Sequence, residues 1–297
     1  MGELMDIGRV GVAQMGFVTD PATVVRGAAR ELEELGYGAL WYPESLVAKE
    51  CFAAGTLLLA ATERVPVATG IANVWARDAM TMACGARTLE EAFPGRFLLG
   101  LGVSHAEQVG PHGFDYTKPV STMRNYLDRM EALNYVGPEP AGPVQLMLAA
   151  LRPKMLELAR DRTIGAHPYF VPVEHTRRAR EILGEGRLLA TKQTVILETD
   201  ADAARELARS FTPFYLGKTN YSKALTWLGY SENDVAGAGS DRLIDDVIAW
   251  GDTDAIASRF EAHLDAGADH VCVHVLAEPG RFPMEELRAL APSLLAL

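Results

Sequence analysis

The feature that most constrains the fold of this chain is a repeated alternation of short apolar runs with longer helical segments. Eight runs have the composition of buried strands, at residues 8–14, 39–43, 65–72, 96–102, 144–149, 163–168, 192–197 and 270–276. Helical patterns separate most of these runs. Strands that alternate with helices of this size form parallel βαβ units. Eight such units in 297 residues predict an α/β fold, a TIM (β/α)8 barrel, as one domain over residues 1–297.

Two segments are longer than an ordinary connection between a strand and a helix. Residues 104–120 are rich in Gly, Pro and aromatic residues, and residues 211–250 form a second long stretch. In a TIM barrel, the segments that follow the strands lie at the C-terminal face and shape the active site. We therefore expect both to be insertions at that face, with surface elaboration as the alternative.

The charge balance limits the partners of this chain. With 28 basic and 39 acidic residues the formal net charge is −11, which argues against a broad nucleic-acid surface but allows a basic pocket for one anionic ligand. Cys51, Cys84 and Cys272 are scattered and lack CxxC spacing, as is typical of a reducing cytoplasm. The N-terminal stretch does not have the pattern of a signal peptide, and the apolar runs are too short to span a bilayer. We expect a cytoplasmic protein that binds neither nucleic acid nor membranes.

A pair of glycines ends the fourth predicted strand. The run Gly100-Leu-Gly102-Val-Ser-His105 has the spacing of a dinucleotide fingerprint, but His105 stands at the third glycine position and no helix follows directly. We interpret Gly100 and Gly102 as residues that let a flat ligand approach the backbone; packing within a barrel strand is the alternative. The sequence contains no P-loop, no Gly-x-Ser-x-Gly elbow and no metal-binding histidine motif, so we predict no metal site.

Histidines and aromatic residues at the strand ends are further candidates for the site. His167 ends the sixth predicted strand, and the strand ends of a barrel face its active site. His270 and His274 share one face of the last predicted strand, and we interpret them as structural histidines. The aromatic candidates for the walls of a cleft, with core packing as the alternative, are Trp41, Trp75 and Tyr169.

Five segments, in order along nearly the whole chain, carry a family pattern. They are LWYPE at 40–44, ERVPVATGIANVWAR at 63–77, PGRFLLGLGVS at 94–104, LAALRPKMLELA at 148–159 and AGADHVCVH at 266–274. Together they resemble the bacterial luciferase-like flavin and deazaflavin oxidoreductases of the luciferase-like monooxygenase superfamily. The branch that uses coenzyme F420, a deazaflavin, is the one that this chain is most similar to.

The resemblance implies a TIM-like barrel with a flavin-type ring at its C-terminal mouth. In the family, a non-proline cis peptide at the end of strand three lies behind the ring, and here it would be the Gly70–Ile71 bond. The phosphate would lie near the ends of strands five and six, and after strand five a helix N-terminus and Arg152 offer donors to an anion. Arg177 and Arg178 follow on the next helix, where a solvated helix face is the alternative. The predicted cofactor-binding residues are Gly70, Ile71, Asn73, Gly102, Val103, Ser104, Gln108, Ala150, Leu151, Arg152 and His167.

Two residues are predicted to carry the chemistry. His105 stands where relatives that act on sugar phosphates have an acidic catalytic residue, and a histidine pKa in the neutral range suits a general acid or base. Glu44, after strand two, replaces part of an aspartate–histidine pair of those relatives and is predicted to be a charge partner of His105 or an acceptor for the substrate. Both departures argue against a sugar-phosphate substrate.

The resemblance leads to a functional expectation with two alternatives. We expect an F420-dependent oxidoreductase that transfers a hydride between the deazaflavin and a small organic substrate, because the cofactor carries the redox chemistry while the protein aligns the reactants. An FMN-dependent monooxygenase of the same superfamily is the first alternative. A barrel that binds a flavin without catalysis is the second. The substrate stays open, and so does a homodimer as the oligomeric state.

Overall fold

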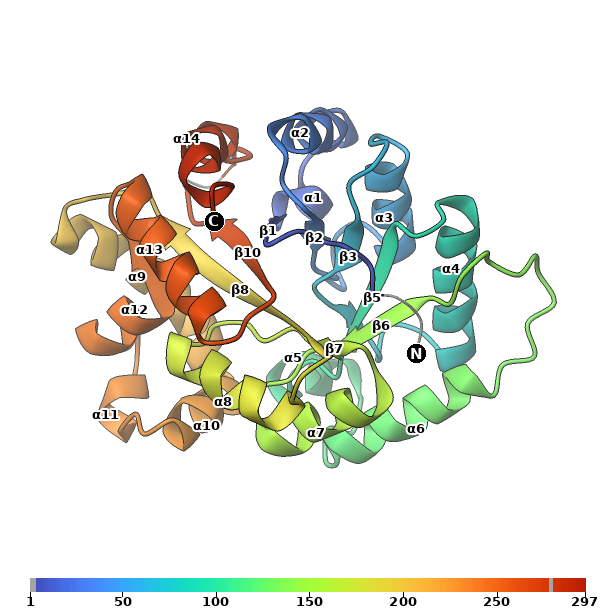
Figure 1. The fold of residues 1–297 in the computed structure, drawn as a ribbon. Helices are drawn as coiled ribbons and strands as arrows, with labels where there is room; N and C mark the ends of the chain where they lie inside the picture. Colours follow the sequence, from blue (N-terminus) through green and yellow to red (C-terminus); the bar gives the residue numbers. More distant parts are fainter. Residues whose placement is uncertain (1–3, 278–279) are drawn as a thin grey trace.

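A computed structural model describes residues 4–277 and 280–297 and shows a barrel of parallel strands inside a ring of helices (Figure 1). The barrel strands are β1 (Val10–Ala13), β2 (Leu40–Tyr42), β3 (Val67–Thr69), β5 (Phe97–Gly102), β6 (Gln145–Leu148), β7 (Gly165–Ala166), β8 (Leu188–Ile196) and β10 (His270–Val275). They pair in the order β10-β1-β2-β3-β5-β6-β7-β8, and the pairing of β10 with β8 closes the barrel. The predicted α/β barrel is confirmed.

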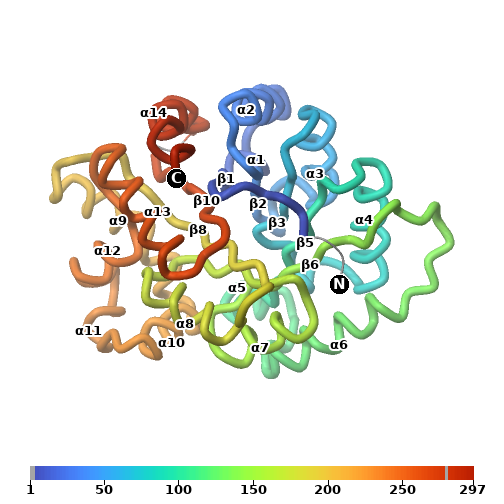
Figure 2. Tube along the Cα trace, viewed as in Figure 1, coloured from blue at the N-terminus to red at the C-terminus, as the bar shows by residue number. Residues whose placement is uncertain are grey.

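The helices pack outside the strands, most of them through one apolar face. The tube in Figure 2 shows them around the barrel: α2 (Ala22–Leu35), α3 (Cys51–Leu59), α4 (Ala79–Ala92), α6 (Pro119–Glu131), α7 (Pro153–Arg162), α8 (Val173–Leu183), α13 (Thr253–Asp265) and α14 (Met284–Leu294). In α2, Val25, Ala28, Ala29 and Leu32 are buried, a spacing that forms one stripe at 3.6 residues per turn. Gly36 ends this helix with φ of 97°, a left-handed conformation that glycine adopts at low cost.

The third predicted strand, residues 65–72, is divided in the structure. It consists of β3 and of β4 (Ala72–Asn73), which pairs with the end of β5, and the Gly70–Ile71 peptide bond between them is cis, as the sequence predicts. A side chain at Gly100 would collide with the carbonyl oxygen of Thr69, and a Cβ at Gly102 would lie 2.5 Å from Ile71 Cδ1. These glycines therefore make room for the 69–71 segment. These contacts support the packing alternative, and Gly102 also lines the cavity described below, so close approach of a flat ligand at Gly102 stays a prediction.

The segment after β8 is mostly helical and contains one strand that the sequence patterns do not predict. It comprises α9 (Ala201–Leu216), α10 (Thr219–Trp227), α11 (Glu232–Val235), α12 (Asp241–Val247) and β9 (Ile248–Trp250). β9 pairs with Thr194–Ile196 at the end of β8. β7 has only two residues, so it pairs with the start of β8 alone and leaves the last residues of β8 free for β9. α9 extends into the long stretch predicted at residues 211–250, because it continues through Pro213 to Leu216.

The remaining elements are short and lie in the connections after β1 and β5. They are α1 (Gly16–Thr19), α5 (Ala106–Val109) and the 3-10 turn η1 (Gly110–His112). Over the ranges that the structure describes, no helix is long and apolar enough to cross a membrane.

Candidate functional site

A cavity of about 1310 Å³ opens where the barrel strands end. This volume exceeds the roughly 300–1,000 Å³ of a typical site for one small molecule, so it has room for a cofactor and a substrate together. The wall is built by the strand ends, the 104–120 segment, the start of α7 and the α9–α10 region. All thirteen residues predicted to be catalytic or cofactor-binding line this cavity: Glu44, Gly70, Ile71, Asn73, Gly102, Val103, Ser104, His105, Gln108, Ala150, Leu151, Arg152 and His167.

A strained turn at the end of β5 positions His105. Ser104 has a φ of 57°, in the left-handed region that non-glycine residues rarely occupy. The Tyr116 hydroxyl donates a hydrogen bond of 3.0 Å to the Ser104 carbonyl oxygen and so ties the turn to the 104–120 segment. His105 then stacks on Tyr221 of α10, with ring centroids 4.9 Å apart. Strained backbone of this kind clusters at functional sites.

The environment of His105 keeps its imidazole neutral. Burial and, second, the charge of Lys218 lower the pKa of His105 to about 4, while Glu107 acts in the opposite direction. Its Nδ1 is buried and has no hydrogen-bond partner within the described residues. The expectation of a pKa in the neutral range is therefore wrong, because the sequence does not reveal that the ring is covered by α10. At pH 7 the imidazole is unprotonated and is able to accept a proton.

His167 presents an acceptor atom at the floor of the cavity. Its Nδ1 donates to the Ala190 carbonyl oxygen at 2.8 Å, so its Nε2 carries a lone pair. Nε2 is buried and finds no partner among the residues described. A Cβ at Gly70 would lie only 3.0 Å from this atom. Burial, followed by the charge of Lys192, lowers the pKa of His167 to about 3, so the ring stays neutral.

Trp41 fixes the orientation of His167 from below. The two rings stack with centroids 4.5 Å apart and an interplanar angle of 6°. The Trp41 indole N–H donates to His270 Nε2 at 3.1 Å, and His270 Nδ1 donates in turn to the Gly8 carbonyl oxygen. His270 is thus a structural histidine, as the sequence predicts. Trp41 is fully buried, so it supports the floor of the cavity and does not line it.

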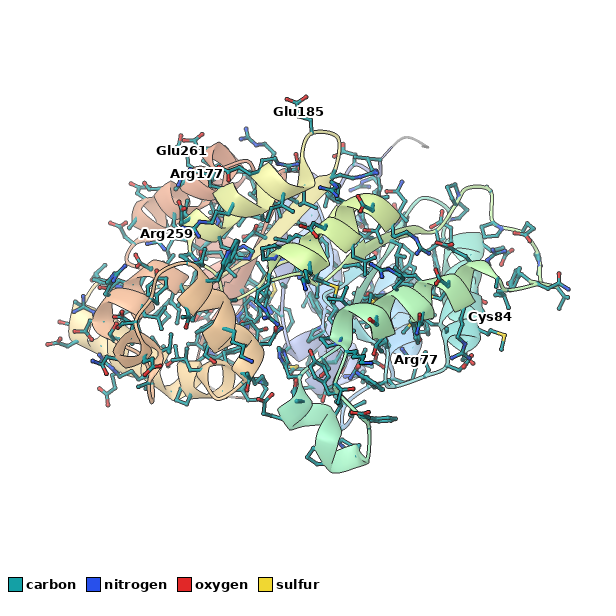
Figure 3. All side chains as sticks on the ribbon, turned by 90° about the horizontal axis from the view of Figure 1, so that it is seen from below. Arg77, Cys84, Arg177, Glu185, Arg259 and Glu261 are labelled. Atoms are coloured by element: carbon teal, nitrogen blue, oxygen red, sulfur yellow. The ribbon has the colours of Figure 1, made fainter. Side chains whose placement is uncertain are left out.

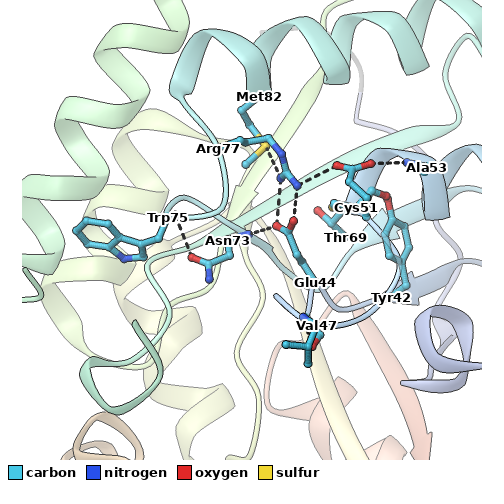
Figure 4. A network of polar contacts seen from close by, with 12 residues as sticks. Tyr42, Glu44, Val47, Cys51, Ala53, Thr69, Asn73, Trp75, Arg77 and Met82 are labelled. Atoms are coloured by element: carbon cyan, nitrogen blue, oxygen red, sulfur yellow. Dashed lines mark hydrogen bonds and ion pairs between the residues drawn. The ribbon is translucent and has the colours of Figure 1, made fainter. Parts of the chain in front are cut away.

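Glu44 lies at the cavity, but its carboxylate is already bound by protein groups (Figure 4). Both of its oxygens pair with the Arg77 guanidinium, and Oε2 also accepts from the Asn73 amide at 2.7 Å. The Glu44 amide donates to the Ile71 carbonyl oxygen at 3.1 Å. The residue therefore holds the 71–73 segment at two points. A catalytic role for Glu44 stays a prediction, and this geometry favours a positioning role.

The cavity is basic although the chain is acidic. Of the charged residues that the structure places on its wall, one is the ion-paired Glu44 and five are basic: Arg152, Lys154, Lys192, Lys218 and Lys223. Arg152 precedes α7 and donates to Asn220 Oδ1 at 3.1 Å, which joins the start of α7 to α10. Such a wall favours anionic ligands.

Arg177 and Arg178 do not reach this wall. Both pair with Glu174 on the same helix, and Arg177 lies at the outer surface in Figure 3. The alternative of a solvated helix face therefore holds for Arg177. The Arg178 side chain packs on Trp227 and donates to its carbonyl oxygen.

Lys192 and Tyr215 are wall residues that the sequence analysis does not single out, whereas His274 is a wall residue that it interprets as structural. Lys192 projects into the barrel from β8, and His274 lines the cavity, where its Nδ1 lies 3.2 Å from both the Tyr169 and Thr194 hydroxyls. Tyr169 is a wall residue, as predicted, whereas Tyr215 comes from the unpredicted extension of α9. A lysine within a strand of a fully buried barrel is the one pattern that points to such a site from sequence. No group of three or more His, Cys, Asp or Glu residues in the described ranges is placed to hold a metal ion.

Comparison with known sequences gives matches to one family. The family model described as luciferase-like monooxygenase matches residues 8–270. A protein of Mycobacterium tuberculosis with the name "Putative coenzyme F420-dependent oxidoreductase" is 25% identical over 276 residues, which cover 71% of this chain and 79% of that protein. A 5,10-methylenetetrahydromethanopterin reductase of Methanolobus tindarius is 24% identical over 163 residues, so the match spans only half of each chain.

Solved structures of the same fold include enzymes with either cofactor. An F420-dependent secondary alcohol dehydrogenase in complex with an F420-acetone adduct has a TM-score of 0.74 at 15% identity, over 96% of this chain and 98% of that one. The F420-dependent tetrahydromethanopterin reductase of Methanopyrus kandleri has a TM-score of 0.75 at 16% identity, over 98% and 99%. The oxygenating constituent of 3,6-diketocamphane monooxygenase of Pseudomonas putida, in complex with FMN, has a TM-score of 0.69 at 14% identity, over 97% and 95%.

At 14–16% identity, the likeness to solved structures establishes the fold alone. The family is established by the match to the family model. The matched residues run from the start of the barrel into its last strand. They include every residue that the sequence assigns to the site. The chain belongs to the luciferase-like monooxygenase family.

Proposed function

We propose that this protein is an F420-dependent oxidoreductase that moves a hydride between the deazaflavin and a small organic substrate. The observation that carries the proposal is a cavity with basic groups on its wall and an unpartnered acceptor, His167 Nε2, beside the cis Gly70–Ile71 bond. Support comes from the relative in Mycobacterium tuberculosis that is named as F420-dependent. The family membership supports an oxidoreductase with a flavin-type cofactor.

The part of the cavity around His167 and the 70–73 segment fits a flat heterocycle such as the cofactor ring. Ile71 and Val103 offer apolar surface, and Asn73 stands at the end of β4. His167 Nε2 is a buried acceptor in need of a donor, which a ring N–H supplies. Gly70 keeps a side chain out of the space next to that atom. We assign Gly70, Ile71, Asn73, Gly102, Val103 and His167 to the ring.

The residues at the other end fit an anionic tail. Arg152 and Lys154 stand at the start of α7, where the first amides of the helix lack intrahelical partners. Ser104 and Gln108 face this end from the 104–120 segment, and Ala150 and Leu151 lead into the helix. We assign the phosphate of the cofactor to this end, because an arginine side chain and free amides are typical phosphate donors.

The cofactor, when bound, supplies the hydride chemistry, and the chain must handle the accompanying proton. His105 is the residue that we assign to this step. It lines the cavity, its ring is held by Tyr221, and it is unprotonated at neutral pH. In the oxidative direction it is able to accept the substrate proton, and in the reductive direction the protonated ring returns it.

Titration of the purified protein with each cofactor tests the proposal. Isothermal titration is expected to show F420 binding at least tenfold more tightly than FMN, a difference of about 1.4 kcal/mol. The Arg152→Ala variant should lose affinity for F420, whereas Arg177→Ala, on the outer surface, should not. Equal or reversed preference would exclude the F420 assignment. It would favour the FMN-dependent monooxygenase instead, for which the FMN complex of the diketocamphane enzyme is the structural precedent.

A further inference from the structure

Lys192 places a buried ammonium group in the cavity without a counter-ion. It lies in the middle of β8, its residue is 8% exposed, and its side chain reaches the cavity. Its Nζ lies 4.0 Å from the centroid of the Tyr169 ring. Among residues 4–277 and 280–297, no carboxylate lies within 4.0 Å of Nζ and no acceptor forms a hydrogen bond with it.

The titratable groups around Lys192 do not supply a negative charge. Cys272 faces it from β10, and burial raises the pKa of this thiol well above its ordinary value, so it stays neutral. His167 at the end of β7 and His274 on β10 are kept neutral by burial, with the charge of Lys192 as the second cause of their lowered pKa. Burial lowers the pKa of Lys192 itself to about 8, which leaves it protonated at pH 7.

Burying an ammonium group without an anionic partner costs desolvation free energy, and the cation–π contact with Tyr169 offsets only part of that cost. Groups of this kind are concentrated at sites where a ligand completes the pairing. Lys192 is a single point charge with no arginine beside it, unlike the start of α7 with Arg152 and Lys154. The single charge of one ammonium group balances the single charge of a carboxylate. A phosphate carries more charge and more acceptor oxygens, which the basic residues and free amides at the start of α7 satisfy.

The surface next to Lys192 is aromatic. Tyr169 lies under its ammonium group, and Tyr215 packs edge-on against Tyr169 with centroids 5.1 Å apart. Phe211 and Tyr221 extend this wall along the cavity from α9 and α10. Aromatic walls favour a flat, apolar ligand body. The Lys192 ammonium group and the aromatic wall together favour a ligand with an aromatic ring and one anionic group.

We propose that Lys192 binds the carboxylate of the substrate and that the substrates of this protein are aromatic carboxylic acids. That such a ligand is reduced or oxidised rests on the proposed function, whereas its binding does not. The carboxylate pairs with the Lys192 ammonium, and the ring lies along Tyr169, Tyr215 and Phe211. His105 and His167 are neutral, and the nearby Lys218, 5.0 Å from the Tyr215 ring centroid, already donates to the Phe214 carbonyl oxygen at 2.7 Å.

Isothermal titration of the protein at pH 7 without any cofactor tests the inference with two probes. Benzoate and benzamide have the same ring and nearly the same shape but differ in charge. Benzoate is expected to bind at least about tenfold more tightly than benzamide. Lys192→Met should lower benzoate affinity about tenfold or more and leave benzamide affinity within about threefold, because only the ion pair is lost.

Lys223→Met is the matched control, since Lys223 is an exposed lysine on the same cavity wall, and it should keep the preference. Lys192→Gln repeats the test if the methionine variant does not fold. Failure of benzoate to bind, equal affinities in the unmodified protein, or a preference that survives both Lys192 variants would overturn the inference. The F420 titration is independent, so a benzoate preference without F420 binding would reject the proposed function alone.

Discussion

Replacing His105 by alanine is expected to lower turnover by about 10²–10⁴-fold, the range for loss of a positioned general acid or base. The ring is held over the cavity by Tyr221 and by the strained turn at Ser104. F420 affinity should change little, because the residues assigned to the ring and the phosphate are elsewhere. Turnover is measured as the change in deazaflavin absorbance with an aromatic 2-hydroxy acid such as mandelate, and in reverse with reduced F420 and phenylglyoxylate.

The pH dependence of the reaction separates His105 from an ordinary histidine. Its lowered pKa means that the neutral ring is present well above pH 4 and is lost as the pH falls through about 4. In the direction that needs the unprotonated ring, the turnover rate should therefore not fall as the pH is lowered past 6.5, the ordinary pKa of histidine, and should fall only near pH 4. If His105 only packs against its neighbours, His105→Ala should lower the melting temperature and leave turnover near normal. His167 would then be the next candidate for the proton transfer.

Replacing Arg77 by methionine is expected to lower the free energy of unfolding by about 3–5 kcal/mol, as measured by urea denaturation. The side chains of Arg77 and Glu44 are only 11% and 4% exposed, so removal of the guanidinium leaves a buried carboxylate without its cation. Glu44 also holds Asn73 and Ile71 through hydrogen bonds. The variant should therefore bind F420 more weakly as well.

Two further variants isolate this effect. Arg87→Met removes a more exposed pair with Glu139, and surface pairs of this kind contribute about 0–1 kcal/mol. The double variant Glu44→Gln, Arg77→Met should recover part of the stability, since the amide carries no charge to bury. A loss below about 1 kcal/mol in Arg77→Met, equal to the Arg87→Met control, would contradict the role given to the pair.

The barrel is predictable from the sequence because its strands are buried almost throughout and therefore appear as short apolar runs. β9 does not stand out, because its three residues follow α12 directly without a turn, and its pairing depends on how short β7 is. The extension of α9 is missed for a local reason. Pro213 normally ends a helical pattern, yet this helix continues for three more residues to Leu216.

The location of the cavity is also predictable, because strand ends and the segments after them face the mouth of a barrel. Its electrostatics are not. Whether His105 has a pKa near 6.5 or near 4 depends on α10, which is more than a hundred residues away in the sequence. The pairing of Glu44 with Arg77 depends on how the segments that follow β2 and β4 meet in space. Lys192 can be assigned to the cavity only once the structure shows that its side chain points into the barrel.

A crystal structure of the protein with F420 bound tests the central claim most directly. We predict that the deazaflavin ring lies against Ile71 and Val103, with a ring N–H within hydrogen-bond distance of His167 Nε2, and that the phosphate contacts Arg152 at the start of α7. The space along Tyr169 and Lys192 should stay open for the substrate. A ring bound outside this cavity, or one that occupies the Lys192 side and leaves His167 Nε2 without a partner, would contradict the assignment.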